Sequence, residues 1–135
     1  MSRLSAFLNP LPIQQEKEVV ISSRFADEEG NPVPFKIRAL TQEENDEIVR
    51  QSTRRRKADG QWQESLDNIE FSRRMVVAAT VEPDFRSDEL CRACGVLDPL
   101  LVPGKLLLSG EYARLVREIT ALSGFDADAE DEAKN

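Results

Sequence analysis

The hydrophobic pattern of this chain changes its period once, early in the sequence, and that change limits the folds open to it. Residues 18–25 (EVVISSRF) and 35–40 (FKIRAL) alternate apolar and polar side chains, as half-buried strands do. Gly30, Asn31 and Pro32 lie between them and favour chain reversal, so we expect an N-terminal antiparallel β-hairpin. A two-stranded hairpin is marginal in water. Its apolar face must therefore pack on the helices predicted farther along the chain.

A helical pattern begins immediately after the predicted hairpin. Thr41 followed by Glu44 has the spacing of a capping box, which predicts a helix that begins at Gln42. Acidic side chains in its first turn and the basic run Arg54, Arg55, Arg56 and Lys57 at its end would both complement the helix dipole. We expect a polar linker over residues 57–63.

The rest of the chain reads as further helices. A wide apolar face over residues 66–81, in which Ile69 takes part, predicts a central helix. Ser87 is a typical N-cap residue and Gly95 a typical left-handed C-terminal residue, which together predict a short helix between them. A further helix is predicted to start at Asp98 and to be broken by Pro103 and Gly104. The last helix has the clearest periodicity, with apolar side chains at Tyr112, Leu115, Val116, Ile119 and Leu122.

The predicted architecture is α+β: one mostly helical domain over residues 1–125, with four or five helices and one N-terminal hairpin. The length of 135 residues suits a single core. Residues 126–135 carry five acidic side chains and one lysine, which predicts a disordered acidic tail. No apolar run approaches the roughly 18 residues of a membrane span, and the N-terminus lacks a secretory h-region, so we expect an intracellular protein without membrane contact.

The composition gives little support to catalysis. The chain has no histidine, no Gly-rich phosphate loop and a net charge of -7, which disfavours nucleic acid as a partner. Cys91 and Cys94 form a C-x-x-C pair, but a structural zinc site needs four ligands. We interpret both cysteines as small buried apolar residues. We therefore expect no enzyme activity, no metal and no cofactor.

The basic run at residues 54–57 is the one feature that suggests nucleic acid. The nearest aromatic side chain that could stack on a base is Trp62. The alternative interpretation is a solvated helix end that pairs with the acidic tail or with an acidic partner.

Two aliphatic segments suggest protein binding. The N-terminal arm, one helical turn before Pro10, and the LLVPGKLLL segment offer more apolar side chains than one small core needs. Packing of both segments on the core explains them equally well. The candidate partner-binding residues are Leu4, Phe7, Leu8, Leu106, Leu107, Leu108 and Tyr112.

Several of these segments together resemble a known family. The blocks GNPVPFKIRALTQEE, ATVEPDF and SGEYARLV, with LSGFD at residues 122–126, are similar to the XkdN-like phage tail assembly chaperones. The resemblance implies a non-enzymatic protein of the host bacterial cytoplasm that binds the tape measure protein, keeps it soluble and helps recruit tail-tube subunits. It also implies departure from the finished particle, and related chaperones have a second, frameshifted product.

Two other functions stay open at this point. One is a small phage or prophage nucleic-acid-binding regulator that uses the basic run, and the other is a structural component retained in the tail. Self-association through the exposed edge of the hairpin is also conceivable.

Overall fold

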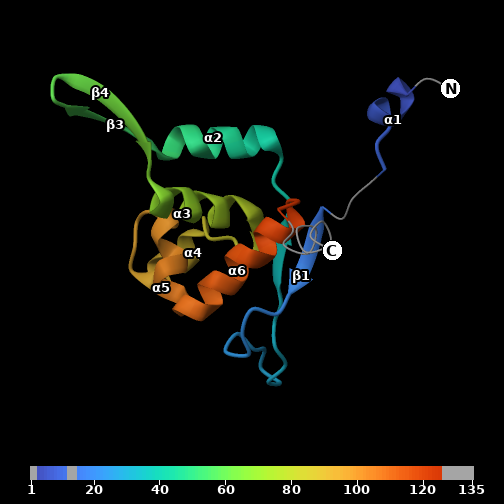
Figure 1. Ribbon diagram of the computed structural model, residues 1–135. Helices are drawn as coiled ribbons and strands as arrows, with labels where there is room; N and C mark the ends of the chain where they lie inside the picture. The colour runs from blue at the N-terminus through green and yellow to red at the C-terminus, as the bar shows by residue number, and fades with distance from the viewer. Residues whose placement is uncertain (1–2, 12–14, 126–135) are drawn as a thin grey trace.

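The computed structural model describes residues 3–11 and 15–125 and confirms the α+β class with its N-terminal hairpin (Figure 1). The tail predicted for residues 126–135 lies outside the described residues. The described part holds six α-helices, one short 3₁₀ helix at Pro99–Leu101, and five strands. The α-helices are α1 (Leu4–Leu8), α2 (Gln42–Ser52), α3 (Asn68–Ala79), α4 (Asp88–Cys94), α5 (Val102–Leu106) and α6 (Ser109–Leu122), and the strands are β1 (Glu16–Val19), β2 (Phe35–Arg38), β3 (Thr53–Ala58), β4 (Gln61–Leu66) and β5 (Thr80–Glu82).

The predicted hairpin is part of a three-stranded antiparallel sheet in the order β1-β2-β5. Val19 pairs with Phe35, and Ile37 pairs with Thr80 of the third strand. The first strand lies earlier and is shorter than residues 18–25, since the chain leaves the sheet after Val19 and forms a long connection. Ile21 in that connection is still buried, because it turns into the core rather than along the sheet.

Helix α3 lies at the centre of the molecule, with α2 on one side and α4, α5 and α6 on the other (Figure 1). Its Val76 and Ala79 are fully buried, as are Leu115 and Ile119 of α6. Phe85, just after β5, is also fully buried in this core. The central position of this helix was predicted, but its length was not: residues 66–81 divide among β4, α3 and β5.

The predicted start of α2, both predicted ends of α4 and the predicted break after Asp98 are confirmed. The Thr41 hydroxyl accepts from the Glu44 amide at 3.2 Å, and the Glu44 carboxylate accepts from the Thr41 amide at 3.1 Å. Ser87 caps α4, and Gly95 ends it with φ of 71°. The broken helix after Asp98 is a 3₁₀ turn followed by α5, which tolerates Pro103 in its first turn.

The basic run is not the end of a helix, and residues 57–63 are not a linker. Helix α2 ends at Ser52, and Arg54 to Lys57 lie in β3, which pairs with β4 in a second, two-stranded sheet. Asp59 and Gly60 connect the strands with φ of 52° and 79°. Two positive φ values at an Asp-Gly pair are typical of a type I′ hairpin turn. The Asp59–Gly60 pair, which lies inside the predicted linker, therefore marks a second hairpin.

Candidate functional site

An open groove of about 450 Å³ lies between the first half of α3 and the junction of α5 with α6. We call it the α3/α6 groove. Leu107 is buried and Tyr112 is half-buried, and we call them the floor of the groove; the polar Asn68 and Arg73 are exposed and form its rim. The groove is lined by Asn68, Ile69, Ser72, Arg73, Gly104, Leu107, Ser109 and Tyr112.

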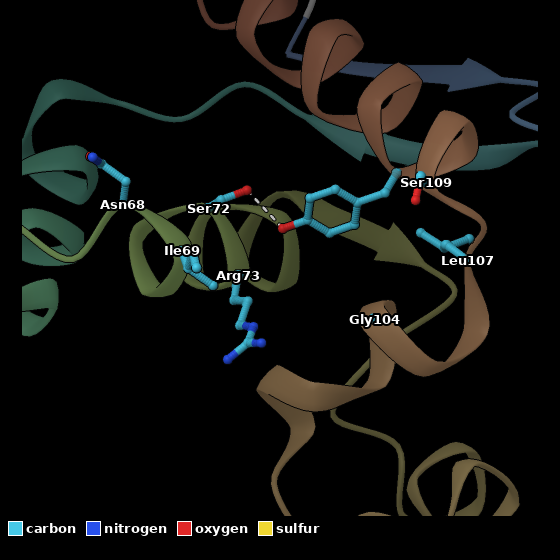
Figure 2. A pocket seen from close by; sticks show the side chains of 8 residues that line it. Asn68, Ile69, Ser72, Arg73, Gly104, Leu107 and Ser109 are labelled. Atoms are coloured by element: carbon cyan, nitrogen blue, oxygen red, sulfur yellow. Dashed lines mark hydrogen bonds between the residues drawn. The ribbon is translucent and has the colours of Figure 1, made fainter.

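The floor of the groove is fixed to the core. Leu107 is only 8% exposed and belongs to the main hydrophobic cluster. The hydroxyls of Tyr112 on α6 and Ser72 on α3 are hydrogen-bonded at 2.7 Å, the dashed line in Figure 2. Arg73 extends from α3 into the hollow (Figure 2). This bond joins the two helices that form the walls of the groove.

An ion pair between the exposed Arg24 and the buried Glu111 holds the α5–α6 junction in place. Arg24, from the long connection after β1, donates to both carboxylate oxygens of Glu111 at 2.9 and 2.6 Å and to the Leu106 carbonyl at 3.1 Å. The Leu108 amide also donates to Glu111, at 2.7 Å. Hydrogen bonds from Arg24, then from Ser22 and the Leu108 amide, lower the pKa of Glu111 to about 2. The carboxylate is therefore charged across the physiological pH range.

The structure divides the predicted partner-binding residues among three places. Leu107 and Tyr112 line the α3/α6 groove. Leu108 lies between two groove residues and is 61% exposed. Leu106 lines a different hollow of about 310 Å³, which contains Phe25 and Leu90.

The N-terminal candidates lie apart from the groove. Leu4, Phe7 and Leu8 are all exposed on α1, which stands away from the rest of the molecule (Figure 1). The sequence suggested both apolar segments, but the structure does not bring them together.

Sequence reasoning missed the α3 wall of the groove. Ile69 was placed on the buried stripe of the central helix, yet it is 67% exposed. Asp67 caps α3 by accepting from the amides of Ile69 and Glu70, both at 3.1 Å, so Ile69 lies in the first turn. That turn extends beyond the core. The Asp67 cap was a local signal that could have placed the helix start correctly.

Both cysteines pack in or against the hydrophobic core. Cys91 is 7% exposed in the core, and Cys94 is half-buried beside it. Both thiols are free. In the described residues, no three His, Cys, Asp or Glu side chains gather in a way that could hold a metal ion.

The basic run forms an exposed ribbon, residues 53–66. Arg54 pairs with Asp67 and Glu70, each at 3.0 Å, which raises the pKa of its guanidinium. Arg55 lies 5.0 Å from the centroid of the Trp62 ring. The sequence placed Trp62 in a linker, and the structure places it across the ribbon from Lys57.

The fold is a small α+β domain, and the α3/α6 groove on it combines apolar and polar lining residues. No helix in the described ranges 3–11 and 15–125 has the length and apolarity to cross a bilayer. The chain belongs to the family of phage XkdN-like tail assembly chaperone proteins, whose family model matches residues 4–134. The resemblance found in the sequence is thereby confirmed.

Two proteins of Bacillus subtilis strain 168 are similar to this chain over nearly its full length. The protein YqbN is 39% identical over 131 residues, which cover 95% of this chain and 88% of YqbN. The phage-like element PBSX protein XkdN is 36% identical over 138 residues, which cover 98% of this chain and 93% of XkdN. The crystal structure of YqbN superposes with a TM-score of 0.77, at 36% identity, over 93% of this chain and 99% of that one.

Proposed function

We propose that this protein is a phage tail assembly chaperone that binds the tape measure protein, keeps it soluble in the host bacterial cytoplasm and helps recruit tail-tube subunits. Family membership supports the chaperone role, and that role is not enzymatic. The relative XkdN is named as a protein of a phage-like element, which fits a phage or prophage origin. The observation that supports a binding site is the α3/α6 groove, where Leu107 and Tyr112 lie beside the exposed Ile69.

The groove suits one face of an amphipathic helix. A groove that binds such a helix needs apolar side chains for its anchor residues and polar side chains at the edge, where the helix meets water. The apolar contacts come from Leu107, Ile69 and the Tyr112 ring. The polar edge is formed by Asn68 and Arg73. At about 450 Å³ the hollow admits a few anchor side chains rather than a whole helix.

Co-expression with the tape measure protein tests this site. We expect Ile69→Ser combined with Leu108→Ser to shift the tape measure protein to the insoluble fraction, because both side chains are exposed beside the groove floor. Leu97→Ser is the matched control, since Leu97 is fully exposed and does not line the groove. A melting curve checks that all variants are folded. Equal client solubility with the control and the double variant would show that the groove is not the binding site.

Helix α1 is a second proposed contact for the client. Phe7 and Leu8 are 79% and 69% exposed, so Phe7→Ser with Leu8→Ser should leave the melting temperature unchanged. If α1 binds the client, the α1 variant by itself lowers the soluble yield of the tape measure protein. Adding the groove substitutions to it lowers the yield further. An unchanged yield removes α1 from the binding surface.

A departing chaperone and a retained tail component differ in one measurable respect. We expect mass spectrometry of purified particles to show the tape measure protein and the tube protein without this chain. Its presence in stoichiometric amounts would favour the structural role. Self-association through the outer edge of β1, which is unpaired in the described sheet, stays a prediction that light scattering can check.

A further inference from the structure

The β3–β4 ribbon is a basic element on an acidic protein. It carries four basic and two acidic side chains, whereas the whole chain has a net charge of -7. Arg54 is neutralised at the base of the ribbon by Asp67 and Glu70, and Arg55 lies 3.8 Å from Glu64. Within the described part of the chain, Arg56 and Lys57 have no ion pair. With Asp59 at the turn included, the outer half of the ribbon has a net positive charge, carried by Arg56 and Lys57.

The ribbon also lacks a packing partner in the described structure. It projects past the end of α2, away from the core (Figure 1). Every side chain of β4 is exposed, and Trp62 is 61% exposed. Because an isolated pair of strands is only marginally stable in water, a bound polyanion would stabilise the ribbon as well as neutralise it.

We propose that the ribbon binds the acidic segment at residues 126–135 of the same chain. That segment carries five acidic side chains and one lysine, so its charge is opposite to that of the ribbon. The contact would occupy Arg56 and Lys57 and shield them from other polyanions. It is independent of the α3/α6 groove and does not rest on the proposed chaperone function.

The distances along the chain permit this contact. The Leu40 amide donates to the Ser123 hydroxyl at 3.0 Å, and Phe125 lines a small hollow with Gln42, so the last described residue lies at the start of α2. Helix α2 is 11 residues long, about 16 Å, and the ribbon begins directly after it. Arg56 is about 10 Å farther along β3. The last acidic residue, Glu132, lies seven positions after Phe125, and seven extended residues span up to about 25 Å. The Glu132 and Arg56 side chains are long enough to close the remaining gap.

Acidic side chains on α2 lie beside this path and oppose the contact only weakly. Glu44 is paired with Arg38 at 2.5 Å, and Glu47 is paired with Arg50. Glu43 and Asp46 remain, and both are exposed. Their repulsion and the attraction at the ribbon both weaken with added salt. The attraction should dominate, because the segment contacts Arg56 and Lys57 directly and only passes Glu43 and Asp46.

Trp62 provides a direct measurement, because it is the only tryptophan of the chain and lies beside Arg55 on the ribbon. We would compare the fluorescence of the full chain with that of a variant that ends at Phe125. The expected result is a difference in emission at about 0.01 M salt that disappears at about 1 M salt, since the Debye length falls from roughly 30 to 3 Å. Identical emission at low salt would overturn the proposal.

Charge variants separate binding by the acidic side chains from a general effect of truncation. Changing the five acidic residues of the segment to Asn or Gln should reproduce the emission of the truncated chain. In the full chain, Arg56→Gln with Lys57→Gln should abolish the response to salt. Arg86→Gln with Arg117→Gln makes the same change in charge elsewhere and should preserve the response; loss of the response in this control would contradict the ribbon site.

A synthetic peptide of residues 126–135 tests whether the contact can be formed from its parts. Added to the truncated chain at low salt, it should restore the emission of the full chain, and added salt should reverse the effect. The signal of the full chain should not depend on protein concentration, because a tethered segment has a fixed effective concentration. A concentration-dependent signal would assign the segment to a second copy and overturn the intramolecular contact.

Discussion

The α5–α6 junction and the β3–β4 ribbon both present exposed apolar side chains, but they are attached to the fold in different ways. At the junction, the exposed Leu108 follows the buried Leu107, and the Arg24–Glu111 pair ties the segment to a distant loop. The ribbon continues directly from α2 and is held at its base by Arg54. A change at the junction should therefore affect the stability of the whole domain, whereas a change on the ribbon should stay local.

The largest expected difference is in the free energy of unfolding, which a core substitution in α6 should lower much more than a substitution on the ribbon. Leu115→Ala removes a fully buried side chain of α6 and should lower the free energy of unfolding by about 2–5 kcal/mol. Leu66→Ala on the ribbon removes a similar side chain that is 41% exposed, so its cost should be well under half as large. Denaturant unfolding measures both. Equal losses would mean that the ribbon is part of the cooperative core.

Acid sharpens the comparison through Glu111. Its pKa is about 2 in the folded protein, against an ordinary 4.5, because of the hydrogen bond from Arg24 first and those from Ser22 and Leu108 next. A carboxyl whose pKa is lowered by folding stabilises the fold above its unfolded pKa and loses that effect as the pH falls. We expect the melting temperature to drop as the pH is lowered from about 4.5 towards 2.

Glu111→Gln gives the control for the acid effect. The variant should melt at a lower temperature at neutral pH and show a shallower decline in acid. Part of the decline should remain, because Arg38 lowers the pKa of Glu44 to about 2 and the two carboxyls titrate in the same range. An unchanged acid profile would show that the Arg24–Glu111 pair does not hold the junction.

The smallest effect is expected at the turn of the ribbon. Gly60 has φ of 79°, so Gly60→Ala introduces strain of roughly 1 kcal/mol. Faster amide hydrogen exchange should appear in β3 and β4 while the global unfolding free energy stays nearly constant. Gly110→Ala in the first turn of α6 is the matched change, since its φ is ordinary and its Cβ meets open space. It should be neutral or slightly stabilising.

Local signals in the sequence were sufficient for much of the fold and for half of the groove. The Thr41–Glu44 box, the Ser87 and Gly95 ends of α4 and the periodicity of α6 all depend on side chains within a few positions of one another. The surplus of aliphatic side chains in the LLVPGKLLL segment placed Leu107 among the candidate binding residues, together with Tyr112 at the start of the last helix. The wall that contains Ile69 was missed, because a periodic pattern does not show which turn of a helix extends beyond the core.

The sequence by itself determined the start of α2, both ends of α4, the α+β class and the family, because these follow from short-range hydrogen bonding and from residue patterns. Only the tertiary structure decided that Thr80 joins β2 in a sheet and that Arg24 clamps Glu111, 87 positions away. It also separated Leu106 from Leu107 into two hollows. Such contacts form between segments that are far apart in the sequence. The residues next to each partner therefore carry no pattern that predicts the contact.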